Sequence, residues 1–132
     1  MNGINKVILA GRIDQGPFTS HGSNGLHIAR IDLITTESYI NKEGDIVKNE
    51  QQKHQLVFFA QAAEYVSKNL RKGMMILAEG KLKHRLWKDD FGNEKPITEV
   101  SCNHVQIISA DKIADEISSD DISRAVRMAA KR

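Results

Sequence analysis

The sequence predicts an all-β fold: a small closed Greek-key barrel of five strands, with one helix between the third and fourth strands. Three observations predict it: five segments have strand composition or alternation, one segment after the third changes to a helical period, and polar or glycine-containing turns separate them. The 132 residues suffice for one such domain and a short extension. We place the domain at residues 1–110 and a C-terminal tail at residues 111–132.

The five strand segments are residues 5–13, 26–36, 54–60, 74–87 and 97–108. The turn signal Gly16-Pro17 is expected to end the first strand. In the second, Ala29 and Leu33 lie on the face that carries its apolar residues, so this strand is expected to be half-buried. Gly80 lies inside the fourth strand and predicts a bulge or bend there.

The connections complete the predicted topology. Residues 37–53 are polar and contain a turn near Gly44, so they form either a long excursion or a hairpin arm. Residues 61–70 have a helical period, with Val66 and Leu70 on one face. This order of five strands and one helix is typical of the oligonucleotide-binding (OB) fold.

The tail, residues 111–132, is expected to be helical. Ile113 and Ile117 lie one turn apart, and Ser118 begins a segment that has an N-cap and acidic first-turn residues. Such a helix either packs on the barrel or between subunits, or becomes ordered only when a partner or DNA binds.

Composition excludes several classes of protein. No apolar stretch approaches the ~20 residues of a membrane helix, and charged residues interrupt the early apolar run at residues 7–10, so neither a spanning helix nor a signal peptide is expected. The single cysteine, Cys102, rules out an internal disulfide framework and suits a reducing cytoplasm. The net charge of +2 does not by itself indicate a nucleic-acid partner.

Residues with catalytic or metal-binding spacing are lacking. Cys102-x-His104 is a single pair without a further cluster, and the other histidines are scattered. The adjacent carboxylates Asp89 and Asp90 do not converge on a common point, so they predict no acid–base dyad. We therefore expect no enzyme, no metal site and no cofactor, which also argues against a nuclease on a small barrel.

The segment 81–87 carries the clearest pattern of candidate binding residues. On a strand, Lys81, Lys83, Arg85 and Trp87 share one face. Cations that follow phosphates and an indole that stacks on any base suit single-stranded nucleic acid. The alternative is a solvated edge strand whose lysines oppose aggregation.

Two further aromatic residues are candidate stacking platforms. If Leu56 and Phe58 fill the core, Phe59 points outward, where stacking on a base or burial in a subunit interface would explain it. Tyr39 lies where the second strand leaves for its arm. Each has an ordinary alternative: Phe59 could be core, and Tyr39 could pack within a loop. Further basic candidates, each better explained on its own as a surface charge, are Lys6, Arg12, Arg30, Arg71 and Lys72.

An ordered series of motifs resembles bacterial single-stranded DNA-binding proteins over about residues 3–105. The motifs are Gly3-Ile4-Asn5-Lys6-Val7-Ile8-Leu9-Ala10-Gly11, Leu33-Ile34-Thr35-Thr36-Glu37-Ser38-Tyr39, Ala63-Glu64-Tyr65, Leu70-Arg71-Lys72-Gly73, Ala78-Glu79-Gly80-Lys81-Leu82, Lys83-x-Arg85-x-Trp87 and Thr98-Glu99-Val100. An ordered series is more specific than any one of its motifs.

The resemblance implies an OB barrel that binds single-stranded DNA without sequence preference, in bacterial replication, recombination or repair. It also implies a homo-oligomer, a tetramer or else a dimer, in a cytoplasmic protein associated with the nucleoid. By position, Tyr39, Phe59 and Trp87 match the base-stacking aromatics of the family, and His54 matches a subunit-interface histidine. The matched backbone contacts are Lys6, Arg71, Lys72, Lys83 and Arg85.

The sequence departs from the family pattern at two places. Lys53 stands where the family has a tryptophan, which predicts weaker stacking, an added phosphate contact and a steeper salt dependence. Cellular members end in a linker and an acidic tip that recruits proteins, whereas this chain continues past Asp120-Asp121-Ile122 to Lys131-Arg132. We therefore expect a divergent member without that tip, such as a paralogue from a plasmid, phage or integrated element.

A second hypothesis is a replication-restart accessory protein, like the primosomal OB proteins. In that case the face built by residues 81–87 binds a protein partner, and DNA binding is secondary. A dimer with weak DNA affinity would favour it.

Overall fold

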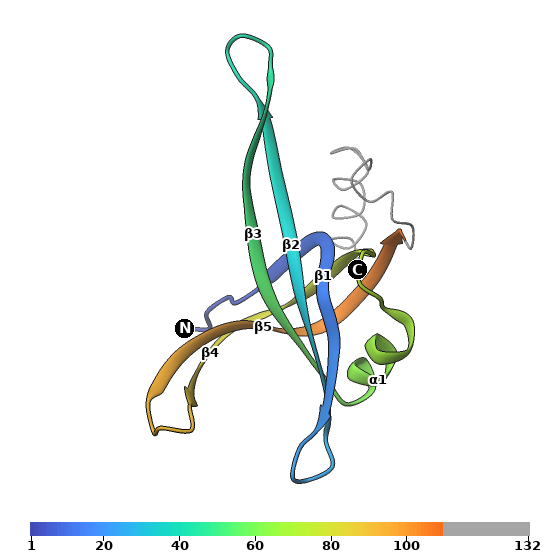
Figure 1. Ribbon diagram of the computed structural model, residues 1–132, viewed down its shortest axis with the longest axis vertical. Coiled ribbons are helices and arrows are strands. Elements are labelled where there is room, and N and C mark those ends of the chain that lie inside the picture. The colour runs from blue at the N-terminus through green and yellow to red at the C-terminus, as the bar shows by residue number, and fades with distance from the viewer. Residues whose placement is uncertain (110–132) are drawn as a thin grey trace.

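The computed structural model describes residues 1–109. The predicted helical tail, residues 111–132, and the predicted end of the domain at residue 110 therefore lie outside the described residues. The elements are β1 (Val7–His21), β2 (His27–Ile40), β3 (Ile46–Phe59), α1 (Ala60–Asn69), β4 (Met75–Lys88) and β5 (Glu94–Ser109). The strands close into a barrel in the order β1-β2-β3-β5-β4 (Figure 1). The predicted all-β OB barrel, with its helix between the third and fourth strands, is confirmed.

The core forms where the apolar faces of the strands meet inside the barrel. In β2, Ala29 and Leu33 are fully buried, as their alternation predicts. Leu56 and Phe58 of β3 are buried in the same cluster. All strand neighbours are antiparallel except β3 and β5, which run parallel and pair only at Leu56↔Val100 and Val57↔Ser101. The pairing of β3 with β5 is thus limited to these two residue pairs.

Helix α1 completes the core. It packs against β1, β2 and β3 (Figure 1), and its Ala63 and Val66 are fully buried, together with Leu70 at its C-cap. The helix begins one residue earlier and ends one residue earlier than the 61–70 predicted, a difference common at helix ends.

The prediction that Gly16-Pro17 ends the first strand is wrong. Strand β1 continues to His21, with register shifts on both sides of Gln15. Gly16 has a φ of +104°, and a Cβ there would lie 2.7 Å from the carbonyl oxygen of Arg30. Pro17 lacks an N–H, which an irregular pairing tolerates. The Gly-Pro signal therefore marks a bulge inside a strand, not its end.

Of the two interpretations of residues 37–53, the hairpin arm is correct. Strands β2 and β3 continue their pairing well beyond the barrel as a long two-stranded arm, out to Ile40↔Ile46 (Figure 1). At its tip the Asn41 side-chain oxygen accepts hydrogen bonds from the backbone N–H groups of Glu43 and Asp45.

Strands β4 and β5 form a second, shorter arm, and Gly80 lies at its base. The register shifts between Glu79 and Gly80, which confirms the predicted bulge. At the tip, Asp89 accepts hydrogen bonds from the backbone N–H groups of Phe91 and Asn93. The bond from Asn93 is the main reason why the pKa of Asp89 lies below its usual value.

The Cys102 thiol is buried among core residues, and burial raises its pKa to about 12. An unfolded chain loses this proton near pH 8.5. As pH rises above about 8.5 the unfolded state binds fewer protons than the native state, so the free energy of unfolding should fall, until the native thiol ionises near pH 12. One such group contributes at most about 1.4 kcal/mol per pH unit.

We therefore expect the Cys102→Ala variant to lose less stability than the parent between pH 8.5 and pH 10.5. Urea unfolding at both pH values measures this difference. Equal losses in the two proteins would mean that the native thiol ionises like an exposed one.

Candidate nucleic-acid interface

Strand register places most of the predicted site residues on one outer face of the barrel. Residues directly opposite on paired strands point to the same face. Lys83↔Glu99, Arg85↔Ile97 and Trp87↔Lys95 therefore lie on the outside of β4 and β5, since Val100 next to Glu99 is in the core. By the same reasoning Phe59 is outside on β3, opposite Ile28 of β2. The predicted residues on this outer face are Lys53, Phe59, Lys81, Lys83, Arg85 and Trp87.

The aromatic side chains of this face are accessible. Trp87 is 44% exposed and Phe59 is 38% exposed, while Phe58 and Leu56 of β3 are buried. The structure thus excludes the alternative that Phe59 is an ordinary core residue. Exposure of large apolar rings to water costs free energy, so a face that carries two of them is typical of a surface that binds a ligand or a partner.

An open pocket of about 460 Å³ lies beside Trp87 on this face. It is lined by residues of β2 to β5, namely Arg30, Gln55, Leu56, Arg85, Trp87 and Ile97. It lies next to the short parallel contact between β3 and β5, which includes Leu56. Its volume lies within the range of about 300–1,000 Å³ that is common for small-molecule sites.

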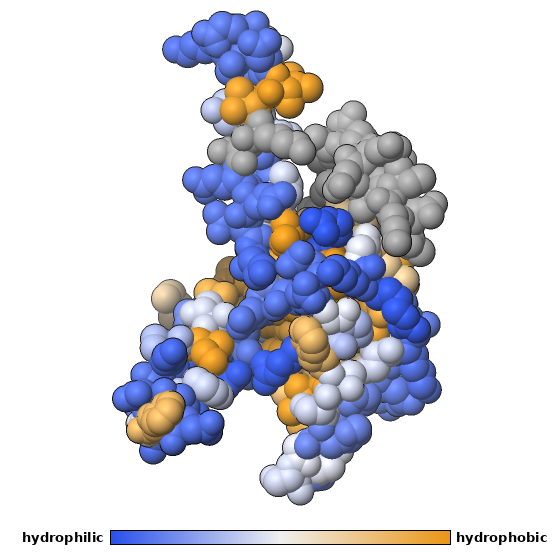
Figure 2. Space-filling view, in the orientation of Figure 1, coloured by the Kyte–Doolittle hydropathy of each residue, from blue (hydrophilic) through white to orange (hydrophobic). Residues whose placement is uncertain are grey.

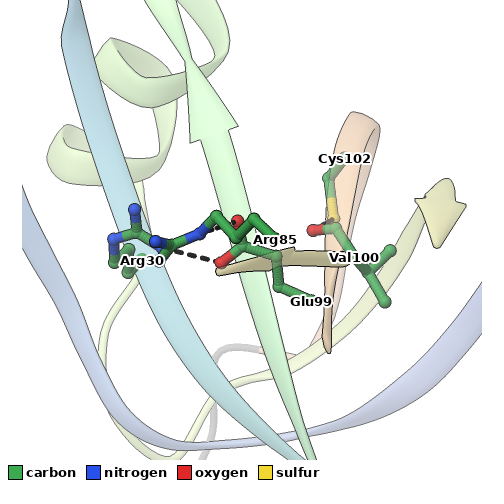
Figure 3. A network of polar contacts seen from close by, with 5 residues as sticks. All are labelled: Arg30, Arg85, Glu99, Val100 and Cys102. Carbon is green, nitrogen blue, oxygen red and sulfur yellow. Dashed lines mark hydrogen bonds and ion pairs between the residues drawn. The ribbon is translucent and has the colours of Figure 1, made fainter. Parts of the chain in front are cut away.

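A buried carboxylate joins two arginines at this pocket. Arg30 donates from Nη1 to Oε2 of Glu99 at 2.8 Å, and Arg85 donates from Nε to Oε1 at 2.9 Å (Figure 3). The Glu99 side chain is 7% exposed, whereas those of Arg30 and Arg85 are 43% and 40% exposed. Both carboxylate oxygens are thus occupied, while other N–H groups of both guanidinium groups remain for a ligand.

Sequence reasoning treated Arg30 as a surface charge and did not single out Glu99. Alternation places Arg30 on the outer face of its strand, which does not distinguish it from other surface charges. The parallel contact between β3 and β5 brings these strands together, and that contact is not readable from local sequence. Sequence reasoning also missed three exposed aromatics: Phe18 opposite Arg30 on β1, Tyr65 on α1, and Phe91 at the tip of the β4–β5 arm.

Several other predicted residues lie away from the pocket or are already paired. Lys6 forms an ion pair with Glu79 at 3.0 Å. Lys53 lies 3.4 Å from Asp14, so part of the charge expected to contact phosphate is balanced within the protein. Tyr39 is half-exposed on the β2–β3 arm, opposite Val47.

The predicted cations after α1 are also separate from the pocket. Arg71 donates to the carbonyl oxygens of Lys68 and Leu70 at the helix C-terminus, a favourable place for a cation, and Lys72 follows it. Arg71 therefore has a structural explanation that does not need DNA.

The residue matched to an interface histidine, His54, is partly buried on β3. Its Nε2 lies 2.9 Å from Thr35 Oγ1 of β2. Farther out, the arm carries exposed apolar side chains just below its hydrophilic tip (Figure 2), where Ile40 and Ile46 pair with each other. The subunit interface at His54 stays a prediction.

Two features of the described residues 1–109 bear on other classes of site. Within that range no three or more histidine, cysteine, aspartate or glutamate side chains gather where they could hold a metal ion. No helix there is sufficiently long and apolar to cross a membrane.

Comparison with known proteins agrees with the fold. The model of the single-strand binding protein family matches residues 4–108, which is most of the chain. The chain belongs to this family. Among solved structures, a deletion mutant of the single-stranded DNA binding protein from Thermus aquaticus matches with a TM-score of 0.69 and 25% sequence identity, over 82% of this chain and 52% of that chain. The chain thus aligns with about half the length of that protein.

Proposed function

We propose that this protein binds single-stranded DNA without sequence preference and without enzymatic activity. Trp87 carries the proposal: an indole on an exposed face, with Lys83 and Arg85 beside it on the same strand and an open pocket at its edge. A ring stacks on any base and cations contact the common backbone, so this combination does not need base readout. Family membership supports the same function.

The proposed interface includes the aromatic and basic residues that match the family by position, together with Lys53 and Lys81, which do not come from that match. Phe59 and Trp87 stack on bases, and Lys81, Lys83 and Arg85 contact phosphates, all from one face. Tyr39, Lys6, Lys53, Arg71 and Lys72 extend the contact if the strand continues around the barrel.

We further propose the setting that the family suggests. The protein acts in replication, recombination or repair, in a bacterial cytoplasm at the nucleoid, and assembles as a homotetramer or a dimer with His54 near a subunit interface. Native mass spectrometry of the full chain gives the number of subunits directly.

A fluorescence titration with dT oligomers of increasing length, at two salt concentrations, tests the proposal. The chain contains one tryptophan, so quenching reports Trp87 alone. We expect strong quenching on binding and an affinity that falls as salt rises, because DNA binding releases the counterions condensed on phosphates.

Three results are informative: one from the titration, one from the titration together with the mass measurement, and one from incubation of the oligomer with Mg²⁺. An oligomer that fails to quench Trp87 at low salt would contradict the proposal. Weak DNA affinity together with a dimeric mass would favour the second hypothesis, a replication-restart accessory protein whose face binds a protein partner. Degradation of the oligomer in the presence of Mg²⁺ would show that the protein is an enzyme.

A further inference from the structure

The three-residue network Arg30–Glu99–Arg85 places a carboxylate on the surface proposed to bind a polyanion. A carboxylate on such a surface repels phosphate and cancels one positive charge. Yet Glu99 is the one buried charged residue among the described residues 1–109, and both of its oxygens point to arginines that line the pocket (Figure 3). Its position calls for an explanation beyond a chance surface ion pair.

The geometry fits a positioning role. Arginine side chains are flexible, and ordering one on binding costs conformational entropy. Glu99 holds Arg30 of β2 and Arg85 of β4 across the barrel wall before any ligand arrives, at 2.8 and 2.9 Å. The network keeps a net charge of +1, because two guanidinium groups share one carboxylate.

The surroundings of the two guanidinium groups match one nucleotide unit. The planar guanidinium group suits two oxygens of a phosphate. Trp87 provides a ring for a base at the same pocket, Gln55 a polar amide, and Leu56 with Ile97 an apolar lining. Phosphate and base would thus be held together.

We propose that the pocket is a subsite for one nucleotide of the strand, in which Arg30 and Arg85 contact the phosphate next to the base stacked on Trp87, and Glu99 is the residue that positions both arginines. This inference rests on the proposed function, and it adds Arg30 and Glu99 to the interface. It predicts a counterintuitive result: removal of a negative charge from the binding face weakens the binding of DNA.

The test is the Glu99→Gln variant with Glu64→Gln as a matched control. Each change raises the net charge by one, and Glu64 is exposed on α1, where it pairs with Lys68 away from the pocket. If only charge matters, both variants bind a dT oligomer slightly more tightly than the parent. If Glu99 positions the arginines, Glu99→Gln binds about tenfold more weakly, the size expected for loss of a charge-assisted hydrogen bond.

Trp87 fluorescence separates this role from a merely structural one. We expect the quenching at saturation to stay as in the parent, because stacking on Trp87 is retained while affinity falls. A melting temperature close to that of Glu64→Gln shows that the barrel is intact. Tighter binding by both variants would overturn the inference and leave the proposed function standing.

The Arg30→Ala variant keeps the inference testable if Glu99→Gln fails to fold. Glu99 then retains Arg85 as a partner. We expect affinity to fall about tenfold, and the slope of log affinity against log salt to become shallower by about one contact. Arg30→Lys keeps the positive charge but lacks the planar guanidinium group that can contact two phosphate oxygens. It should therefore restore the salt slope of the parent but not its affinity. An unchanged affinity in Arg30→Ala would overturn the inference, whereas absence of DNA binding by the parent would instead reject the proposed function.

Discussion

The Trp87→Ala variant is expected to bind single-stranded DNA about 5- to 150-fold more weakly than the parent. In single-strand-binding proteins, alanine substitution shows that base–aromatic stacking contributes about 1–3 kcal/mol per base. Trp87 also forms one wall of the pocket, so its loss removes both the ring and the shape of the site. The barrel should remain folded, because the side chain is 44% exposed on the β4–β5 arm.

Fluorescence anisotropy of a labelled dT oligomer measures this change, since the variant lacks the only tryptophan. Leu86→Ala is a matched control: Leu86 is the preceding residue of the same strand, is 65% exposed and points to the opposite face. Phe59→Ala should also weaken binding without unfolding the domain. Unchanged affinity in both Trp87→Ala and Phe59→Ala would reject the assignment of this face.

The Gly80→Ala variant is expected to lose stability by about 3 kcal/mol, near the top of the range for overpacking. An added Cβ would overlap the carbonyl oxygen of Ser101 and lie 2.7 Å from the Cα of Cys102. These are backbone atoms of β5, so relief requires the β4–β5 pairing to move. That pairing holds Arg85 and Trp87 in place, so DNA affinity should fall as well.

Urea unfolding of the parent, Gly80→Ala and Gly3→Ala measures this loss of stability, with Gly3→Ala as the control. Gly3 lies before β1, and a Cβ there meets nothing within 4 Å. We expect the unfolding midpoint of Gly3→Ala to match the parent. A Gly80→Ala midpoint equal to that of Gly3→Ala would show that the bulge accommodates a side chain.

Local pattern is sufficient for the strands, the helix and the face that carries Trp87. Alternation assigns each residue of a strand to one of two faces, so the sequence alone groups Lys83, Arg85 and Trp87 correctly. Strand ends are harder to predict. Gly16-Pro17 is a turn signal and also a bulge signal, and only the pairing of β1 with β2 decides between the two.

The pocket depends on contacts between strands far apart in the chain. Arg30 and Glu99 are separated by 69 residues and meet at 2.8 Å. Each alone resembles an ordinary surface charge, so the sequence offers no reason to connect them. The same holds for Lys53, whose ion pair with Asp14 joins two strands that are not sheet neighbours.

The sequence by itself determined the all-β barrel, the helix after the third strand and the side of β4 on which the cations and the indole lie, because periodicity is a property of neighbouring residues. Tertiary structure alone decided that Arg30 and Arg85 share the carboxylate of Glu99 beside Trp87. Closure of the barrel through the short parallel contact between β3 and β5 brings these side chains together, and pairing over such distances is set by the packing of the whole sheet.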